Sequence, residues 1–320
     1  MFRVDSGETT RQQTRMTQQK TLSGRAWAEL ALLSGIWGAS FLSVRIALDE
    51  VGFMTSVAYR VGLAATVLWA VVLLRRIPMP TSPRIWGAFL VMGFLNNAIP
   101  FSLMAWAQRS IESGLTSILN SATAIFGVAV AALAFRDERL TIRRTLGASL
   151  GFLGVATAIG LENLLSFDIR SLAQLAVVGG ALSYAIAGAW ARATLSDMPP
   201  QLAAAGMLAG SSLVMIPAAI WLEGTPNFDL RFETWVAIGY LSVIATAGAY
   251  LLYYRVLAMA GSGNLMLCTL LVPPVAIVLG ALARGESLEL RAFAGFAILA
   301  FGMLLLDGRL FGGMRSKRTR

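Results

Sequence analysis

The sequence predicts an all-α integral membrane protein whose ten transmembrane helices form two inverted five-helix repeats. Three observations support this prediction. Ten apolar stretches fill the chain between Trp27 and Leu306, charged residues make up only 13% of the 320 residues, and a nine-residue motif recurs in the second half. A soluble domain carries about 25% charged residues, whereas a helix that crosses a bilayer needs about 20 predominantly apolar residues. Each stretch must be helical, because lipid offers no partners for backbone N–H and C=O groups.

The ten predicted helices follow one another with short connections. They cover residues 27–48, 54–75, 85–107, 113–134, 142–161, 171–192, 201–222, 234–256, 263–283 and 291–307. We therefore expect an N-terminal tail (1–26), a first repeat (27–160), a second repeat (171–307) and a basic C-terminal tail (308–320). Successive helices should lie antiparallel, because the loops are too short for any other arrangement.

The positive charges predict the orientation of the chain. If the N-terminus is cytoplasmic, 19 of the 26 Lys and Arg residues fall on the cytoplasmic side and five on the other, with Arg45 and Arg60 left inside spans. Cytoplasmic segments of membrane proteins are enriched in Lys and Arg, so both termini are expected in the cytoplasm. This distribution also accounts for the net charge of +9 without a nucleic-acid partner.

Several kinds of chemistry are unexpected in this chain. There is no histidine, Cys268 is the one cysteine, and no carboxylate falls at the middle of a predicted span. Histidine and cysteine are the commonest metal ligands and nucleophile partners. We therefore expect no metal, no cofactor and no intramembrane enzyme.

The repeat appears as a short motif found twice. Residues 135–143 match residues 283–291, an offset of 148 residues, and Gly147 and Gly154 then fall on Gly295 and Gly302. Five helices per repeat is an odd number, so the second repeat must be inverted relative to the first. Inverted repeats are typical of alternating-access transporters, whose sites lie near the midplane at the repeat interface. Small residues at helical spacing permit close helix packing, so we assign the fifth and tenth helices to packing rather than to the cavity.

Further motifs carry a family resemblance. The first predicted span contains residues 37–41 (Trp-Gly-Ala-Ser-Phe), the second has Arg60 near its start, and residues 271–275 (Leu-Val-Pro-Pro-Val) lie shortly before Glu286. This pattern resembles the EamA repeats of the drug/metabolite transporter superfamily, most of all its YddG-type bacterial exporters of amino acids and metabolites. One departure is that Ile125 stands at the first-repeat counterpart of Pro273. The proline break therefore exists in one half only.

The resemblance implies a secondary transporter of the bacterial inner (plasma) membrane. It would export small organic solutes, aromatic and other amino acids among them, by alternating access, as a monomer or weak homodimer in the lipid bilayer. A multidrug or nucleotide-sugar type carrier is the alternative. The lack of a mid-depth carboxylate favours passive or exchange transport over ion coupling.

Aromatic and polar residues at mid-span depth are the candidates for the binding site. Asn96 and Asn97 are costly in hydrocarbon unless hydrogen-bonded, and Pro100 is expected to free the carbonyl of Asn96. Trp37 either faces lipid or forms a platform for substrate. The predicted substrate-binding residues are Trp37, Ser40, Phe41, Asn96, Asn97, Phe101, Ser183, Tyr184, Thr246, Tyr250 and Pro273.

Five further residues are predicted to act in gating, namely Arg45, Arg60, Pro100, Tyr254 and Pro274. Arg45 precedes Asp49 by one helical turn and could pair with it. Arg45 and Arg60 either attract a substrate carboxylate at the outer mouth or close the outer gate by pairing with acids there.

Overall fold

The computed structural model describes residues 23–135, 141–160, 169–253, 255–256 and 268–307, which form helices and connecting turns with no β-strand among them. Helices labelled η are π-helices. The elements of the first repeat are α2 (Gly24–Ala47), α3 (Phe53–Leu74), α4 (Pro83–Gly93), η1 (Phe94–Ala98), α5 (Ile99–Ala107), α6 (Ser113–Asn120), α7 (Thr123–Ala134) and α8 (Ile142–Ile159). Those of the second are α10 (Ile169–Thr194), α11 (Pro200–Glu223), α12 (Phe232–Gly239), η2 (Tyr240–Gly248), α14 (Cys268–Arg284) and α15 (Leu290–Asp307).

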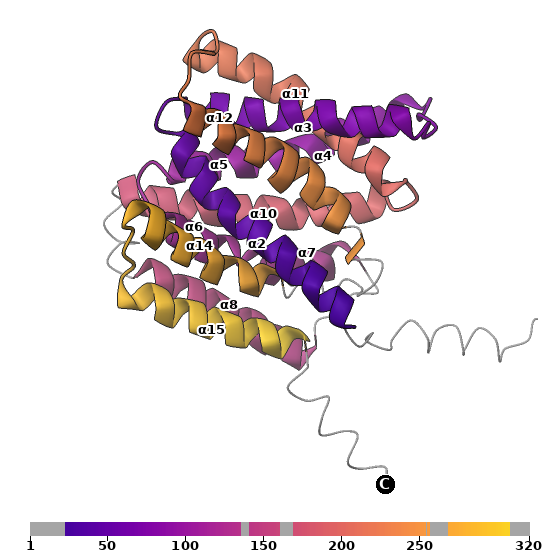
Figure 1. Ribbon diagram of the computed structural model, residues 1–320. Helices are drawn as coiled ribbons and strands as arrows, with labels where there is room; N and C mark the ends of the chain where they lie inside the picture. The colour runs from indigo at the N-terminus through magenta and orange to yellow at the C-terminus, as the bar shows by residue number, and fades with distance from the viewer. Residues whose placement is uncertain (1–22, 136–140, 161–168, 254, 257–267, 308–320) are drawn as a thin grey trace, which may run out of the picture.

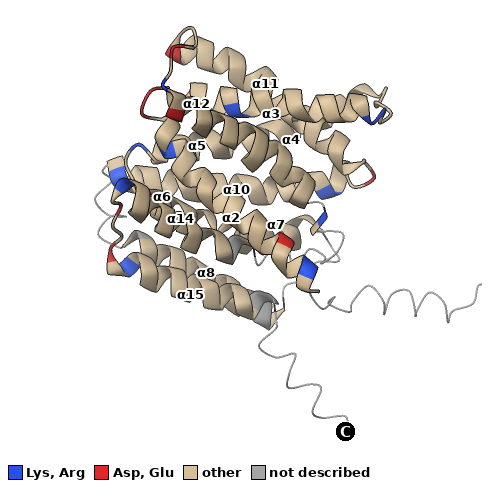
Figure 2. Ribbon diagram, in the orientation of Figure 1, with Lys and Arg blue, Asp and Glu red and all other residues tan. Residues whose placement is uncertain are grey.

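The helices agree closely with the predicted spans. Among the described residues, seven helical runs are long and apolar enough to cross a membrane, including the continuous runs Pro83–Ala107, Ser113–Ala134 and Phe232–Tyr253. Three shorter apolar helices, Thr145–Ala158, Leu271–Arg284 and Leu290–Leu305, occupy the predicted fifth, ninth and tenth spans. Most charged residues of the described chain lie toward the two ends of the bundle (Figure 2).

Helix pairs from the two repeats form the edges of the bundle. α8 packs along α15 at one edge, and α3 packs along α11 at the opposite edge (Figure 1). A Cβ atom on Gly154 would overlap the backbone of Gly295 and Leu299, and one on Gly302 would overlap the backbone of Gly147 and Gly151. The predicted packing role of these glycines is confirmed, because only residues without a side chain allow the two backbones to approach so closely.

The proline and glycine motifs meet where α2 crosses α14. A Cβ atom on Gly38 would overlap the Val275 side chain and contact the carbonyl of Val272. Pro273 is buried in α14 beside this crossing, whereas Pro274 is exposed. Gly38 of the 37–41 motif therefore serves helix packing at this point.

The two π-helical segments lie at equivalent positions of the repeats. Adding the repeat offset of 148 to η1, residues 94–98, gives residues 242–246, which fall inside η2. A π-helical segment contains an extra residue per turn and is frequent at functional sites. Both repeats thus carry the same irregularity at the same depth.

Candidate functional site

Pro100 and the π register of η1 leave one backbone carbonyl free. The N–H of Ile99 bonds to the carbonyl of Phe94, five residues earlier, so in this register Pro100 would be the donor to Leu95. Because proline has no N–H, the carbonyl of Leu95 accepts a hydrogen bond of 2.7 Å from the hydroxyl of Ser183 in α10 instead. The expectation that Pro100 frees the carbonyl of Asn96 assumed α-helical spacing. The π register moves the freed carbonyl to Leu95.

The two asparagines of η1 join a hydrogen-bond network with the second repeat. Nδ2 of Asn96 donates to the hydroxyl of Tyr250 (2.9 Å), which in turn donates to Oδ1 of Asn97 (3.1 Å). Nδ2 of Asn97 donates to Oγ of Ser211 in α11 (3.3 Å). Asn97 is fully buried and Asn96 half-buried. The network therefore satisfies the amides and holds η1 against two helices of the other repeat.

Arg60 of α3 lies beside this network. Its Nε donates to Oγ1 of Thr246 in η2 (2.8 Å), and its guanidinium carbon lies 3.7 Å from the centroid of the Phe101 ring. The ring of Tyr184 in α10 packs edge-on against Phe101, with 6.4 Å between centroids. Within the described part of the chain Arg60 forms no ion pair. A positive charge inside the bundle is thus held by a hydroxyl group and an aromatic face.

Thr246 and Tyr250 connect these two sets of contacts. They lie four residues apart, which is a rise of about 6 Å along a helix, so the contact of Thr246 with Arg60 neighbours that of Tyr250 with Asn96. The structure therefore brings the following predicted residues into one region: Asn96, Asn97, Phe101, Ser183, Tyr184, Thr246 and Tyr250, together with Arg60 and Pro100.

The remaining predicted binding residues form a second, apolar group. Phe41 packs in a core cluster with Val272, and Trp37 packs against that cluster. The ring of Trp37 lies 6.0 Å from that of Tyr253, and the hydroxyl of Ser40 donates to the carbonyl of Trp37 (2.6 Å). Trp37, Ser40, Phe41 and Pro273 therefore line the α2–α14 crossing, which meets the first group through the run 240–253.

The predicted gate residues do not form one group in the structure. Asp49 pairs with Arg284 at the end of α14 (2.5 Å), so the expected pair between Arg45 and Asp49 is wrong. Arg45 is one helical turn from Asp49, but α14 approaches closely and places the Arg284 guanidinium within ion-pair distance of Asp49. Tyr254 lies outside the described residues.

Two residues of α11 belong to the site although the sequence did not indicate them. Sδ of Met207 lies 3.3 Å from Nδ2 of Asn96, and Ser211 contacts Asn97. Their proximity depends on glycines, because a Cβ atom on Gly93 would overlap the backbone of Met207 and Ser211. The spacing of Gly206 and Gly210 is the sequence signal that could have placed α11 against this region.

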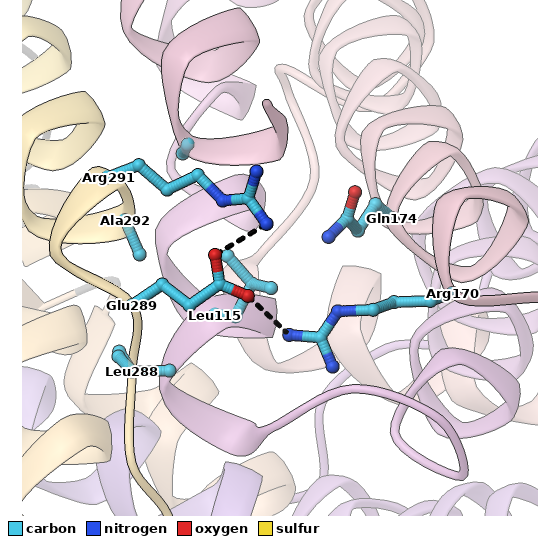
Figure 3. A pocket seen from close by; sticks show the side chains of 8 residues that line it. Leu115, Arg170, Gln174, Leu288, Glu289, Arg291 and Ala292 are labelled. Atoms are coloured by element: carbon cyan, nitrogen blue, oxygen red, sulfur yellow. Dashed lines mark ion pairs between the residues drawn. The ribbon is translucent and has the colours of Figure 1, made fainter. Parts of the chain in front are cut away.

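A small cavity lies near the loops at one end of the bundle, and none of its lining residues belongs to this network. It measures about 10 Å³ and is lined by Leu115, Ala158, Arg170, Gln174, Leu288, Glu289, Arg291 and Ala292. Glu289 lies between Arg170 and Arg291 and pairs with both (Figure 3). This volume suffices for about one water molecule, so the cavity does not suit an organic solute.

Comparison with known proteins places the chain among membrane transporters. The model of the EamA-like transporter family matches residues 25–160 and 171–306. A probable amino-acid metabolite efflux pump of Salmonella typhimurium is 24% identical, with 89% of this chain and 94% of the relative aligned. A probable terminal-alkyne amino-acid exporter of Streptantibioticus cattleyicolor is also 24% identical, over 93% of this chain and 98% of the relative.

A transporter of Bacillus subtilis, YoaV, is 18% identical over 84% of this chain and 92% of its own length. One solved crystal structure shares the fold, with a TM-score of 0.63 at 16% identity, covering 88% of this chain and 96% of that one. The apolar helices and the two segments matched by the family model indicate an integral membrane protein that transports small molecules. The chain belongs to the EamA-like transporter family.

Proposed function

We propose that this protein exports aromatic and other amino acids, and related small solutes, across the bacterial inner membrane by alternating access. In this proposal the chain spans the membrane ten times as two inverted five-helix repeats, with both termini in the cytoplasm. Two of the relatives are described as amino-acid exporters or efflux pumps, and the two π-helical segments at equivalent positions support an inverted internal symmetry.

The observation that carries the proposal is the guanidinium of Arg60. Its Nε bonds to Thr246 and its face covers Phe101, while the two terminal NH₂ groups have no hydrogen-bond partner among the described residues. An arginine presents these groups as a planar fork that matches the two oxygens of a carboxylate. The fork is therefore available to hold the carboxylate of an amino acid.

The amide of Asn96 supplies the complementary group. Its Nδ2 is used by Tyr250 and Met207, and its Oδ1 has no partner in the described part of the chain, so the oxygen can accept a hydrogen bond from an ammonium group. The partners of Arg60 and Asn96, Thr246 and Tyr250, lie four residues apart, a rise of about 6 Å along a helix. This separation suits the adjacent carboxylate and ammonium groups of an α-amino acid.

The apolar part of the substrate would contact the aromatic rings nearby. Phe101 and Tyr184 adjoin Arg60, and Trp37 with Tyr253 forms a second aromatic pair on the neighbouring helices. Aromatic rings bind apolar and aromatic side chains through large contact areas. A cationic drug suits this site poorly, because Arg60 would repel it.

Transport by purified protein in liposomes tests the proposal. Liposomes loaded with unlabelled amino acid are expected to take up labelled phenylalanine, threonine or methionine by exchange, equally with and without an imposed proton gradient. Arg60→Gln should abolish this uptake, and Arg109→Gln, which changes an exposed loop arginine, should not.

Two outcomes would change the proposal. Absence of exchange for every amino acid, with uptake of nucleotide sugars or apolar drugs instead, would replace the substrate class by that of the alternative carriers. Uptake that requires the proton gradient would show that the transport is ion-coupled.

A further inference from the structure

One end of the bundle carries a cluster of acidic residues in its connecting segments and at the adjoining helix ends. We call it the acidic end, and it contains Asp49, Glu50, Glu112, Glu223, Asp229, Glu233, Glu286 and Glu289. Three of these glutamates form hydrogen bonds with the other repeat. Each of Glu50, Glu223 and Glu286 reaches the N-terminus of a helix that belongs to the other repeat.

Glu50, between α2 and α3, caps α12. Its carboxylate accepts hydrogen bonds from the backbone N–H of Arg231 (3.0 Å) and the hydroxyl of Thr234 (2.5 Å), and it pairs with Nε of Arg231 (2.8 Å). The hydroxyl and the guanidinium add charge-assisted bonds to the favourable field at the helix N-terminus. The first repeat is thus held to the start of α12 in the second.

Glu223, the last residue of α11, caps α3 in the same manner. It accepts from the backbone N–H groups of Met54 (3.0 Å) and Thr55 (2.8 Å) and from the Thr55 hydroxyl (2.7 Å). A Cβ atom on Gly52 would overlap the carboxylate of Glu223. Glycine at position 52 therefore makes the room in which this carboxylate lies.

Glu286, between α14 and α15, caps α6. Its two oxygens accept from the backbone N–H and from the hydroxyl of Ser113, both at 2.9 Å. A Cβ atom on Gly280 would overlap Oε2 of Glu286. Gly280 of α14 therefore leaves space for the Glu286 carboxylate, as Gly52 does for that of Glu223.

All three contacts join one repeat to the other at the same end of the bundle. The ion pairs of Asp49 with Arg284 and of Glu112 with Arg170 cross between the repeats at this end as well. At the opposite end, Glu29 of α2 pairs with Arg255 across the repeats. Each of these contacts would have to break for the two repeats to move apart at the acidic end.

We propose that Glu50, Glu223 and Glu286 form a three-point latch that holds the acidic end of the bundle closed. Opening of this end requires the carboxylates to leave the N-termini of α12, α3 and α6 together, after which each carboxylate and each N-terminus is hydrated by water. The latch depends only on contacts within the protein, so this proposal does not depend on which solute is transported.

Distances between spin labels across the acidic end test this latch. Cys268 is the single, buried cysteine, so Cys268→Ser provides a background in which Arg109→Cys and Asp229→Cys place one label on each repeat. The intact latch is expected to give one short distance population. The triple variant Glu50→Gln, Glu223→Gln, Glu286→Gln should add a longer population, whereas Glu233→Gln on the same end should not.

Two glycine variants separate the latch from a general effect of charge. Gly52→Ala and Gly280→Ala keep every charge but displace Glu223 and Glu286 respectively, so each should add a longer-distance population that is smaller than that of the triple variant. Gly127→Ala, where a Cβ atom meets open space, is the matched control. Each single variant leaves the other latch contacts in place, so we expect folding to be preserved, and monodisperse elution from a gel-filtration column checks this. Unchanged distances in the triple variant and in both glycine variants would overturn the proposal.

Discussion

Arg60 and Thr246 join the two repeats inside the bundle, with Nε of the arginine donating a 2.8 Å hydrogen bond to the threonine hydroxyl. Thr246 lies in η2, the π-helical segment that corresponds by the repeat offset to the segment containing Asn96 and Asn97. An irregular helix turns side chains away from the positions that α-helical spacing would give them. The two irregular segments thereby bring an arginine, two amides and two hydroxyl groups together in a surrounding of apolar residues.

The role proposed for Arg60 predicts how substrate analogues behave. Amino-acid amides and esters, which lack the carboxylate, should compete at least about tenfold less well than the parent amino acid, since a hydrogen bond to a charged group is worth about 1.5–3 kcal/mol. Arg60→Lys should weaken the parent and leave the amide unaffected, because lysine keeps the charge and loses the fork. Competition for uptake in liposomes measures both. Equal competition by acid and amide would contradict this role.

The hydroxyl of Tyr250 is predicted to stabilise the protein. Tyr250→Phe leaves Oδ1 of the buried Asn97 without its donor and removes a partner of Asn96. A buried polar group without a partner costs about 1–3 kcal/mol, so the midpoint of thermal unfolding in detergent should fall. Tyr59→Phe removes an exposed hydrogen bond to the carbonyl of Asn227 and should change the midpoint much less. A similar midpoint for both variants would show that the network adds little.

The contact of α8 with α15 predicts a strong position dependence for added methyl groups. Gly154→Ala places a Cβ atom against the backbone of Leu299 and Gly295, so the helices must move apart, at a cost of about 1–3 kcal/mol. Gly127→Ala meets open space and should raise stability by up to about 1 kcal/mol, because alanine favours a helix over glycine. Thermal unfolding of the two variants side by side measures the difference. Equal effects would contradict the close approach of the two backbones.

The contacts of Glu50 predict a dependence of stability on pH. The hydroxyl of Thr234, followed by the N–H and guanidinium groups of Arg231, lowers the pKa of Glu50 below its ordinary value, and Asp49 and Glu233 are the nearby acids that also act on Arg231. A carboxyl group whose pKa is lower in the folded state stabilises that state above the unfolded pKa of about 4.3. This contribution is lost as the pH falls through the folded-state pKa.

Glu50 should therefore be ionised at neutral pH and stabilise the N-terminus of α12 at that pH. The wild type is expected to unfold at a higher temperature than Glu50→Gln at pH 7, and this difference should shrink as the pH falls below about 4. Thermal unfolding of both proteins from pH 7 to pH 3 measures the effect. A difference that is constant across this range would assign the effect of Glu50 to something other than its charge.

The sequence by itself determined the spans, because the thickness of a bilayer sets the length of each apolar helix whatever its neighbours are. Predicted and observed ends differ by three residues or fewer wherever the structure describes both, from Gly24 at the start of α2 to Asp307 at the end of α15. The glycine pattern also indicated that α8 and α15 are packing helices, and the mid-span position of Asn96 and Asn97 indicated a polar site.

Only the tertiary structure decided which groups meet. Asp49 pairs with Arg284 rather than with Arg45, the carbonyl freed by Pro100 is that of Leu95, and Met207 with Ser211 joins the amides. These contacts depend on the rotation of each helix about its axis and on the extra residue of a π turn. Periodicity along the chain does not determine either quantity, because each results from the packing of helices that are far apart in sequence, with 88 residues between Leu95 and Ser183 and 114 between Asn97 and Ser211.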